Sequence, residues 1–493
     1  MKRSLSLLAF AVFAAACSSS PGTGKSGGAQ TGAGNDHPAG HDDGGSGQGS
    51  SGQGQGDDPS GTDDPTEQGG DDDGGLVGGN DAGNDAGSVG SDGGSATDGA
   101  EGGVDGGVGA TCPAAAKGWR AMASASGVSL VALSGFVPSA ARQEAVWTGH
   151  EVLALAGDAS CAHYPCSPLA VAYDPAKDAW RSVAAPPAIN PSYTRWTGDR
   201  WLVVGNVPGT DTLVVEAYDP TTNAWSTFAT PPLSGRTAVA VAWATTTHEL
   251  LLWGGGHNMS VVYSDGSALN PATGVWRPMS ASPLSARADA AASWDGARMV
   301  IVGGGVWIPG KGDGDVFNEN AVADGAAYDP VTNTWTALPT PAFTPRMEAS
   351  AVSLRTGESF VFGGDAHNTD NESGTPLWDG ARMDVGASAW TAVSPPPIDI
   401  PAGPTSGRYG STMVAGDGAF FVWGGARVDG TMPDFADGAR FDVTTGAWTK
   451  LPSGGPSSRY QAIGVWTGCD LMVYGGQANG TAGVLQSGMM YRP

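Results

Sequence analysis

Short apolar runs recur along the chain after residue 120, and many of them end in a pair of glycines. Runs rich in β-branched and aromatic residues are typical of buried strands. A Thr-Gly or Asp-Gly pair often precedes the run and predicts a hairpin turn, and the glycines end the second strand where no side chain fits. The runs are LLLWGGG (Leu250–Gly256), MVIVGGG (Met299–Gly305), SFVFGGD (Ser359–Asp365), FFVWGGA (Phe420–Ala426) and LMVYGG (Leu471–Gly476).

A second recurring segment combines Tyr-Asp-Pro, a polar turn and a tryptophan. Proline fixes φ for the turn, and Thr-Asn or Thr-Gly completes it. The tyrosine therefore ends a third strand, and the tryptophan opens a fourth strand and fills the space between neighbouring sheets. The segments are YDPAKDAW (Tyr173–Trp180), YDPTTNAW (Tyr218–Trp225), YDPVTNTW (Tyr328–Trp335) and the divergent FDVTTGAW (Phe441–Trp448).

These segments repeat with a period of 45 to 59 residues between aligned tryptophans. A ring of four-stranded sheets buries both faces of each sheet, which a lone sheet cannot do. An irregular β-sandwich would not place the tryptophans in register with glycine-ended strands. The aligned tryptophans are Trp180, Trp225, Trp276, Trp335, Trp390 and Trp448, and seven hairpins begin near Arg142, Tyr193, Arg236, Arg287, Arg346, Arg408 and Arg459.

The last repeat stops after its third strand, GMMYRP (Gly488–Pro493). The segment KGWRAMASA (Lys117–Ala125) has the pattern of a fourth strand and supplies a seventh tryptophan, Trp119. We therefore predict that this N-terminal strand completes the final blade of a closed seven-bladed ring.

The combined pattern R…W.G…GG…YDP.TN.W resembles the kelch-repeat family over residues 112–493, although the first two repeats are degenerate, with LAGD and VVGN at the glycine pair. The resemblance implies an all-β, seven-bladed kelch β-propeller. It does not imply one activity, because the same fold serves enzymes and adaptors.

Residues 1–17 have the pattern of an export signal, with Lys2 and Arg3 before a short apolar stretch that ends in AAAC. The end resembles a bacterial lipoprotein signal, which implies lipidation of Cys17. Ala14 stands where such signals usually carry leucine, so ordinary cleavage and secretion is the alternative. We expect an exported protein that is lipid-anchored to the bacterial cell envelope, and this lipid is its one expected membrane attachment.

Residues 18–111 are composed mainly of Gly, Ser, Asp, Ala, Gln and Asn, with 17 acidic residues and one base. A segment with so little apolar surface cannot offset its ordering entropy, so we expect a disordered acidic tether. The remaining residues, 112–493, still carry 32 acids against 21 bases. This balance argues against nucleic-acid binding, which needs basic surface.

The loops between second and third strands are long and polar, and we expect them to share one face with the start of each first strand. Five arginines precede the first strands in a common register, so ring symmetry places them around the channel mouth: Arg236, Arg287, Arg346, Arg408 and Arg459. In kelch adaptors, arginines at the matching position bind acidic peptides. The alternative is that each arginine bonds loop carbonyls or pairs with an aspartate of the neighbouring repeat.

Three loop histidines are weak candidates for a metal site, and two of them (His257 and His367) also for ligand binding: His163, His257 and His367. Calcium ligation by Asp313, Asp315, Asn318, Glu319 and Asn320 is a further option, but the spacing lacks EF-hand order. Resemblance to kelch-type copper oxidases fails because the chain has no Tyr-His pair; His163–Tyr164 is reversed. We predict no catalytic residues, no metal and no cofactor.

Four cysteines remain after Cys17 and allow three pairings. Cys161 and Cys166 lie in one loop, and their pairing leaves Cys112 to bond with Cys469, which the ring topology places at the same end of the last blade. Export allows both bonds.

The sequence favours a monomeric, surface-tethered binding module that holds a protein or glycan on its loop face. The alternatives are a carbohydrate-active propeller enzyme, mutarotase-like or oxidase-like, and a structural envelope protein.

Overall fold

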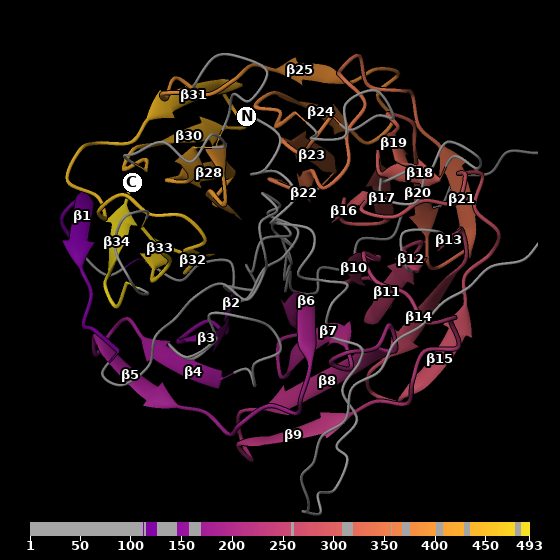
Figure 1. The fold of residues 1–493 in the computed structure, drawn as a ribbon, viewed down its shortest axis with the longest axis horizontal. Coiled ribbons are helices and arrows are strands. Elements are labelled where there is room, and N and C mark those ends of the chain that lie inside the picture. Colours follow the sequence, from indigo (N-terminus) through magenta and orange to yellow (C-terminus); the bar gives the residue numbers. More distant parts are fainter. Residues whose placement is uncertain are drawn as a thin grey trace, which may run out of the picture. The chain divides into compact units, whose positions relative to one another are not determined.

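The chain folds as β-sheets arranged around a ring in the computed structural model (Figure 1). The structure describes residues 112, 115–125, 145–156, 169–257, 261–307, 319–355, 357–366, 375–400, 408–427, 434–478 and 485–493. Within these ranges there are seven four-stranded antiparallel sheets and no helix. The predicted all-β, seven-bladed propeller is therefore confirmed.

Each blade carries its strands in order from the centre of the ring outward. Blade 1 has β2 (Ala145–Trp147), β3 (Val152–Ala156), β4 (Leu169–Asp174) and β5 (Ala179–Ser182); blade 2 has β6 (Asn190–Trp196), β7 (Trp201–Asn206), β8 (Leu213–Asp219) and β9 (Ala224–Thr227); blade 3 has β10 (Ala240–Ala244), β11 (Glu249–Trp253), β14 (Gly266–Asn270) and β15 (Val275–Pro278); blade 4 has β16 (Ala291–Trp294), β17 (Met299–Val302), β20 (Gly325–Asp329) and β21 (Thr334–Ala337).

The later blades follow the same order. Blade 5 has β22 (Ser350–Val352), β23 (Glu358–Phe362), β24 (Gly380–Asp384) and β25 (Thr391–Val393); blade 6 has β27 (Thr412–Gly416), β28 (Ala419–Trp423), β30 (Gly438–Asp442) and β31 (Ala447–Lys450); blade 7 has β32 (Ile463–Trp466), β33 (Leu471–Tyr474), β34 (Gly488–Arg492) and β1 (Gly118–Ala121). The structure also has three two-stranded antiparallel sheets, here called ribbons. They are β12 (Gly256–His257) with β13 (Val261–Val262), β18 (Gly305–Trp307) with β19 (Glu319–Ala321), and β26 (Arg408–Tyr409) with β29 (Ala426–Arg427).

The N-terminal strand closes the ring. Strand β1 pairs antiparallel with the C-terminal strand β34, and Trp119 lies opposite Tyr491. Ahead of this strand in the sequence, Cys112 forms a disulfide with Cys469, in the turn between the first two strands of blade 7, with the Cα atoms 5.6 Å apart. The last blade is thus assembled from both ends of the propeller, and a covalent bond links residues 357 positions apart.

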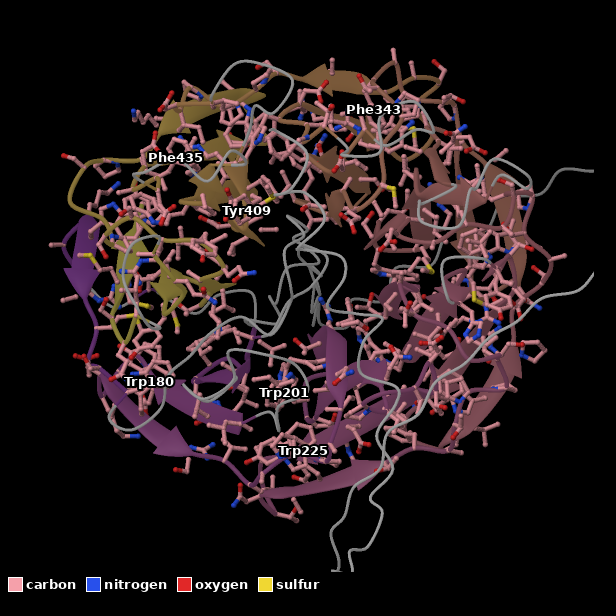
Figure 2. All side chains as sticks on the ribbon, viewed as in Figure 1. Trp180, Trp201, Trp225, Phe343, Tyr409 and Phe435 are labelled. Atoms are coloured by element: carbon pink, nitrogen blue, oxygen red, sulfur yellow. A yellow bond between two sulfur atoms is a disulfide. The ribbon has the colours of Figure 1, made fainter. Side chains whose placement is uncertain are left out.

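The repeated tryptophan joins each blade to the preceding one. At all seven seams its indole nitrogen donates a hydrogen bond of 2.7 to 3.0 Å to a carbonyl just beyond the outer strand of the preceding blade. Figure 2 shows two of these side chains, Trp180 and Trp225, near the outer rim. The pairs are Trp180–Ala123, Trp225–Ala184, Trp276–Ala229, Trp335–Ser280, Trp390–Pro339, Trp448–Ser394 and Trp119–Pro452.

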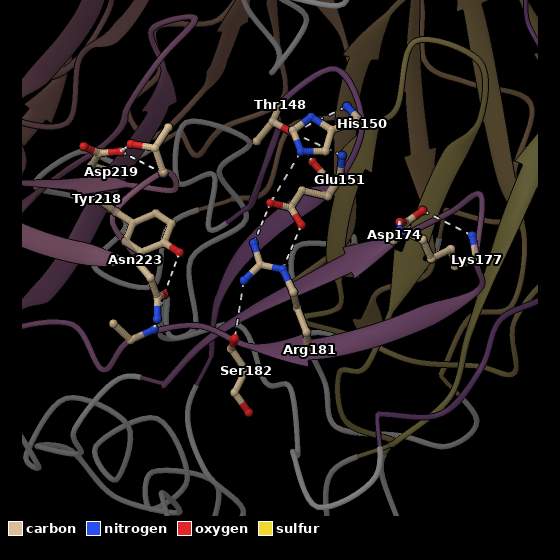
Figure 3. Close-up of polar contacts among 12 residues, drawn as sticks. Thr148, His150, Glu151, Asp174, Lys177, Arg181, Ser182, Tyr218, Asp219 and Asn223 are labelled. Carbon is tan, nitrogen blue, oxygen red and sulfur yellow. Dashed lines mark hydrogen bonds and ion pairs between the residues drawn. The ribbon is translucent and has the colours of Figure 1, made fainter.

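The asparagine of the Tyr-Asp-Pro segment reinforces the same seam. Asn223 adopts a left-handed φ of 52°, which asparagine tolerates better than most residues. Its side-chain oxygen accepts hydrogen bonds from the Tyr218 hydroxyl (2.8 Å) and from the backbone N–H of Ala184 in blade 1 (3.1 Å). Figure 3 shows the Tyr218–Asn223 contact. The repeated segment therefore specifies contacts between neighbouring blades as well as the strands within each blade.

Glu–Arg pairs in which the glutamate is buried stabilise blades 1 and 3 at the same end as the Tyr-Asp-Pro turns. Arg181 donates two hydrogen bonds to Glu151 in blade 1, at 2.6 and 3.0 Å (Figure 3). In blade 3, Arg277 binds Glu249 in the same bidentate way and also donates to the Tyr328 hydroxyl of blade 4 (2.9 Å). Each pair connects the fourth strand of its blade to the second strand, and Arg277 also connects blade 3 to blade 4.

The hydrophobic core lies between adjacent blades. One cluster combines Val465, Met472 and Tyr474 of blade 7 with Val152 and Tyr173 of blade 1, so packing also closes the ring. The chain divides into two units, Met1–Gly94 and Ser95–Pro493, and every described residue belongs to the second. No helix in the described residues is long and apolar enough to cross a membrane. The predicted signal, Cys17 and the predicted tether lie outside the described residues.

Candidate functional site

The two faces of the ring differ in how the strands are connected. We call the side with the connections between second and third strands the loop face, and the side with the first-to-second and third-to-fourth strand turns the turn face. The three ribbons, β12–β13, β18–β19 and β26–β29, all belong to the loop face. Turn-face connections are short, such as residues 245–248 between β10 and β11.

All five aligned arginines lie at the loop-face end of their blades, but their side chains are buried. Their exposed fractions are only 0 to 2%. In each case a guanidinium nitrogen donates to the carbonyl of the first glycine of the glycine pair in the same blade, over 2.9 to 3.2 Å. The pairs are Arg236–Gly254, Arg287–Gly303, Arg346–Gly363, Arg408–Gly424 and Arg459–Gly475.

An aspartate neutralises four of these arginines. It stands directly before the third strand of the same blade and lies 2.6 to 2.9 Å from the guanidinium. The glycine that follows it is required by space, since a Cβ on Gly380 would lie 2.2 Å from the Val361 carbonyl oxygen. The pairs are Arg236–Asp265, Arg287–Asp324, Arg346–Asp379 and Arg408–Asp437.

Arg459 of blade 7 departs from this pattern because Ser487 replaces the aspartate. Its five N–H groups donate to backbone and hydroxyl oxygens of Ser457, Gly475 and Ser487. No carboxylate forms an ion pair with it among the described residues. Burial lowers the pKa of Arg459 to about 10, so it remains charged at neutral pH.

The backbone of the same arginines links consecutive blades. The Arg287 carbonyl accepts from Gly255 N–H of blade 3 (2.9 Å), and the Arg287 N–H donates to the Tyr263 carbonyl (3.1 Å). Blade 2 lacks the glycine pair, and there the Asn206 side chain donates to the Arg236 carbonyl (2.8 Å) instead. Asparagine therefore replaces the glycine N–H in the degenerate repeat.

Aromatic rings cover three of the guanidinium groups. The ring centroids of Tyr263, Phe343 and Phe435 lie 3.7 to 4.0 Å from the guanidinium carbons of Arg236, Arg346 and Arg408. Figure 2 shows Phe343 and Phe435 on blades 5 and 6. Contacts of this kind stabilise a cation that has been removed from water.

Electrostatics in these pairs follow from burial. Burial opposes ionisation of Asp437, but the hydrogen bond and charge of Arg408 outweigh it, so the pKa of Asp437 is lowered. Burial lowers the pKa of Arg346, although the charge and hydrogen bond of Asp379 act in the opposite direction. The Asp437 side chain is therefore a carboxylate near neutral pH.

This geometry departs from the expectation that the arginines present an anion site. The guanidinium groups are enclosed, and those of Arg287 and Arg346 donate to carbonyls and carboxylates of their own blades. The structure favours the alternative role of joining loops and strands, with one correction: the aspartate belongs to the same blade and not to the neighbouring one. The signal in the sequence was the Asp-Gly pair before the third strands of blades 3 to 6.

His257 is the one candidate histidine within the described residues. Its Nδ1 lies 2.5 Å from Oδ2 of Asp211, which belongs to the β7–β8 connection of blade 2. The carboxylate orients the imidazole and links the two blades. His163, His367, Cys161, Cys166, Asp313, Asp315 and Asn318 lie outside the described residues. Glu319 and Asn320 belong to β19, and no group of potential metal ligands occurs in the described part of the chain.

Sequence reasoning missed two tyrosines. Tyr409 and Tyr460 each follow an aligned arginine, and their rings meet at the seam between blades 6 and 7 with centroids 5.5 Å apart. The Arg-Tyr dipeptide, present in these two repeats alone among the five aligned arginines, was the available signal.

Seven blades of this construction, closed by the strand β1, define the chain as a β-propeller. The family model of the KLHDC2/KLHL20/DRC7 Kelch-repeats domain matches residues 193–405, which run from blade 2 to the approach to blade 6. With the seven-bladed ring, this match places the chain in the kelch-repeat propeller family. Kelch propellers commonly serve as protein-interaction modules.

Proposed function

We propose that the protein is an exported, envelope-tethered binding module whose loop face holds a protein or glycan partner. The observation that carries this proposal is the difference between the two faces: the three two-stranded ribbons all lie on the loop face, outside the four-stranded sheets of the blades. Loops held by a rigid scaffold are where binding residues concentrate. The turn face consists of short connections and offers fewer adaptable contacts.

The tether is supported by the sequence before the propeller. The signal-like residues 1–17 end at Cys17, and the acidic residues 18–111 follow. A disulfide between Cys112 and Cys469 suits an oxidising compartment outside the cytosol. Metabolic labelling with a fatty acid tests the anchor: label should enter the wild type and be absent from Cys17→Ser. Equal labelling of both would refute lipidation at this residue.

Exposed valines provide a matched test of the binding face. Val207 and Val261 lie on the loop face and are 37% and 45% exposed, whereas Val331 and Val385 lie on the turn face and are 69% and 47% exposed. Replacing any of them by glutamate should change unfolding free energy little, because surface changes are usually within about 0.5 kcal/mol.

A glycan and peptide array, probed with the full chain, identifies the ligand for this comparison. We expect the loop-face variants Val207→Glu and Val261→Glu to weaken binding of that ligand at least about tenfold, because each places an unpaired carboxylate in the contact surface. The turn-face variants Val331→Glu and Val385→Glu should bind as the wild type does. Loss confined to the turn-face variants, or no ligand on the array, would contradict the proposal.

A further inference from the structure

The seam between blades 6 and 7 carries an aromatic pair near the channel mouth. Tyr409 lies in β26, towards the centre of the ring (Figure 2), and Tyr460 forms a bridge with Gln477. Their rings are half-buried and meet edge to face, with centroids 5.5 Å apart and planes 61° apart. Blades 3, 4 and 5 place Thr237, Ala288 and Met347 at the same position, so the pair distinguishes this seam from those.

Two glutamine amides adjoin the rings. The Tyr460 hydroxyl donates to Oε1 of Gln477 (3.0 Å), and Nε2 of Gln477 lies 3.4 Å from Oε1 of Gln461. Gln461 and Gln477 are half-buried. An amide carries two donors and an acceptor, which suits a ligand rich in hydroxyl groups.

The backbone beneath these side chains is held in place. Gln461 N–H donates to the Gly410 carbonyl (2.7 Å), which joins blade 7 to blade 6. Both residues have left-handed φ values, 53° at Gln461 and 62° at Gly410. A Cβ on Gly410 would lie 3.2 Å from Cγ of Gln461 and 3.4 Å from Cβ of Tyr460. The equivalent residues of blades 3 to 5, Ala238, Asp289 and Glu348, also have positive φ values of 51 to 58°, so this conformation belongs to the repeat and fixes where the seam side chains stand.

The charges beneath the seam are balanced. Arg408 pairs with Asp437 at 2.7 Å, and both Arg459 and Asp434 are buried nearby. Burial, the neighbouring Tyr409 and the charge of Asp434 together raise the pKa of Tyr460, which places this carboxylate within electrostatic reach of its hydroxyl. With two buried arginines set against two aspartates, the seam gives no strong preference for a cation or an anion.

We propose that Tyr409, Tyr460, Gln461 and Gln477 form a subsite for a neutral sugar ring. A tyrosine ring packs against the C–H face of a pyranose while its hydroxyl remains polar. The glutamine amides supply paired donors and acceptors for adjacent sugar hydroxyls. This inference rests on the proposed function of the loop face and selects glycan over protein surface as the ligand chemistry.

The test measures binding of free neutral hexasaccharides of glucose, mannose and N-acetylglucosamine to the full chain by calorimetry. A high-mannose glycoprotein, before and after enzymatic removal of its glycan, shows whether a protein-attached glycan is the source. Tyr460→Leu and Tyr409→Leu should each weaken sugar binding at least about tenfold, since aromatic contacts dominate small interfaces. Tyr409→Phe should retain most of the affinity, because the ring face persists.

Two further variants separate the subsite from folding. Gln461→Gly keeps the left-handed backbone, as Gly410 does in blade 6, and should weaken sugar binding without changing thermal unfolding. Thr237→Ala, at the same position in blade 3, should leave binding unchanged.

Wild-type affinity in both tyrosine-to-leucine variants would overturn the subsite, as would binding of the glycoprotein that survives removal of its glycan. If instead a peptide binds the loop face and no sugar does, the subsite is wrong and the proposed function stands. If neither sugar nor peptide binds, both fail.

Discussion

Arg287→Met tests whether the aligned arginines hold the propeller together. Its guanidinium is fully buried and donates to the Ser285 carbonyl (3.0 Å), the Gly303 carbonyl (3.1 Å) and both carboxylate oxygens of Asp324 (2.8 and 3.1 Å). Methionine keeps the unbranched stem but removes every donor. The Gly303 and Ser285 carbonyls then lose these partners.

The expected cost follows from which partners remain buried. Hydrogen bonds to a charged group contribute about 1.5 to 3 kcal/mol each, so the two carbonyl contacts set the main loss. The Asp324 side chain is 49% exposed, so water replaces the guanidinium and this pair contributes under about 1 kcal/mol. Burying the arginine charge also carries a desolvation penalty that methionine removes. We therefore expect a net loss of about 2 to 3 kcal/mol of unfolding free energy.

Urea unfolding monitored by tryptophan fluorescence measures this change. Arg200→Met is the matched control, since its side chain is 43% exposed and lies 3.7 Å from Asp199 on the turn face; we expect its effect within about 0.5 kcal/mol. Equal unfolding free energies for Arg287→Met and the control would refute the structural role. Combined with loss of an acidic ligand, that result would restore the anion-site interpretation.

Three other predictions concern single contacts. Trp335→Phe keeps a ring at the blade 3–4 seam but loses the 3.0 Å bond to Ser280, and should lower the unfolding free energy by about 1 kcal/mol in urea; no loss would contradict a stabilising role for that bond. Ser487→Asp gives Arg459 the carboxylate that four other blades have, and should raise the midpoint of thermal unfolding; a lower midpoint would show that the serine contacts suffice. Burial raises the pKa of Glu358 despite Arg355 and Arg382, so its contribution to stability falls as pH rises above about 4.5. Glu358→Gln should therefore become more stable relative to wild type between pH 4.5 and 7 in urea titrations, and a constant difference would contradict the shift.

The fold could be predicted because the blades share one sequence pattern. Each glycine pair, Tyr-Asp-Pro turn and tryptophan has a local conformational reason, and the tryptophan recurs in all seven blades. The closing strand was also predictable, because Trp119 matches the tryptophans that open other fourth strands. The degenerate blade 2 was recognisable as a blade, but the substitution of Asn206 for a glycine N–H depends on side-chain geometry.

The candidate site was less predictable. The position of a residue in the aligned repeat gives its location in the blade, but not whether its side chain is exposed to solvent. Sequence symmetry correctly placed Arg346 at the loop-face end of its blade, but whether its guanidinium faced solvent depended on Asp379 and Gly363. The Tyr409–Tyr460 pair arises from two residues 51 positions apart that only the curvature of the ring brings together. A search for deviations within the aligned register would have found it.

Backbone hydrogen exchange of the full chain, with and without the ligand that the array selects, tests the central claim most directly. The account predicts slower exchange on ligand binding in loop-face segments 207–213, 408–411 and 434–437, where backbone N–H groups lie beside the proposed contact surface. Exchange in turn-face segments 245–248, 270–274 and 385–389 should not change. Protection confined to the turn-face segments, or none in the loop-face segments at saturating ligand, would contradict the claim that this propeller binds its partner through the loop face.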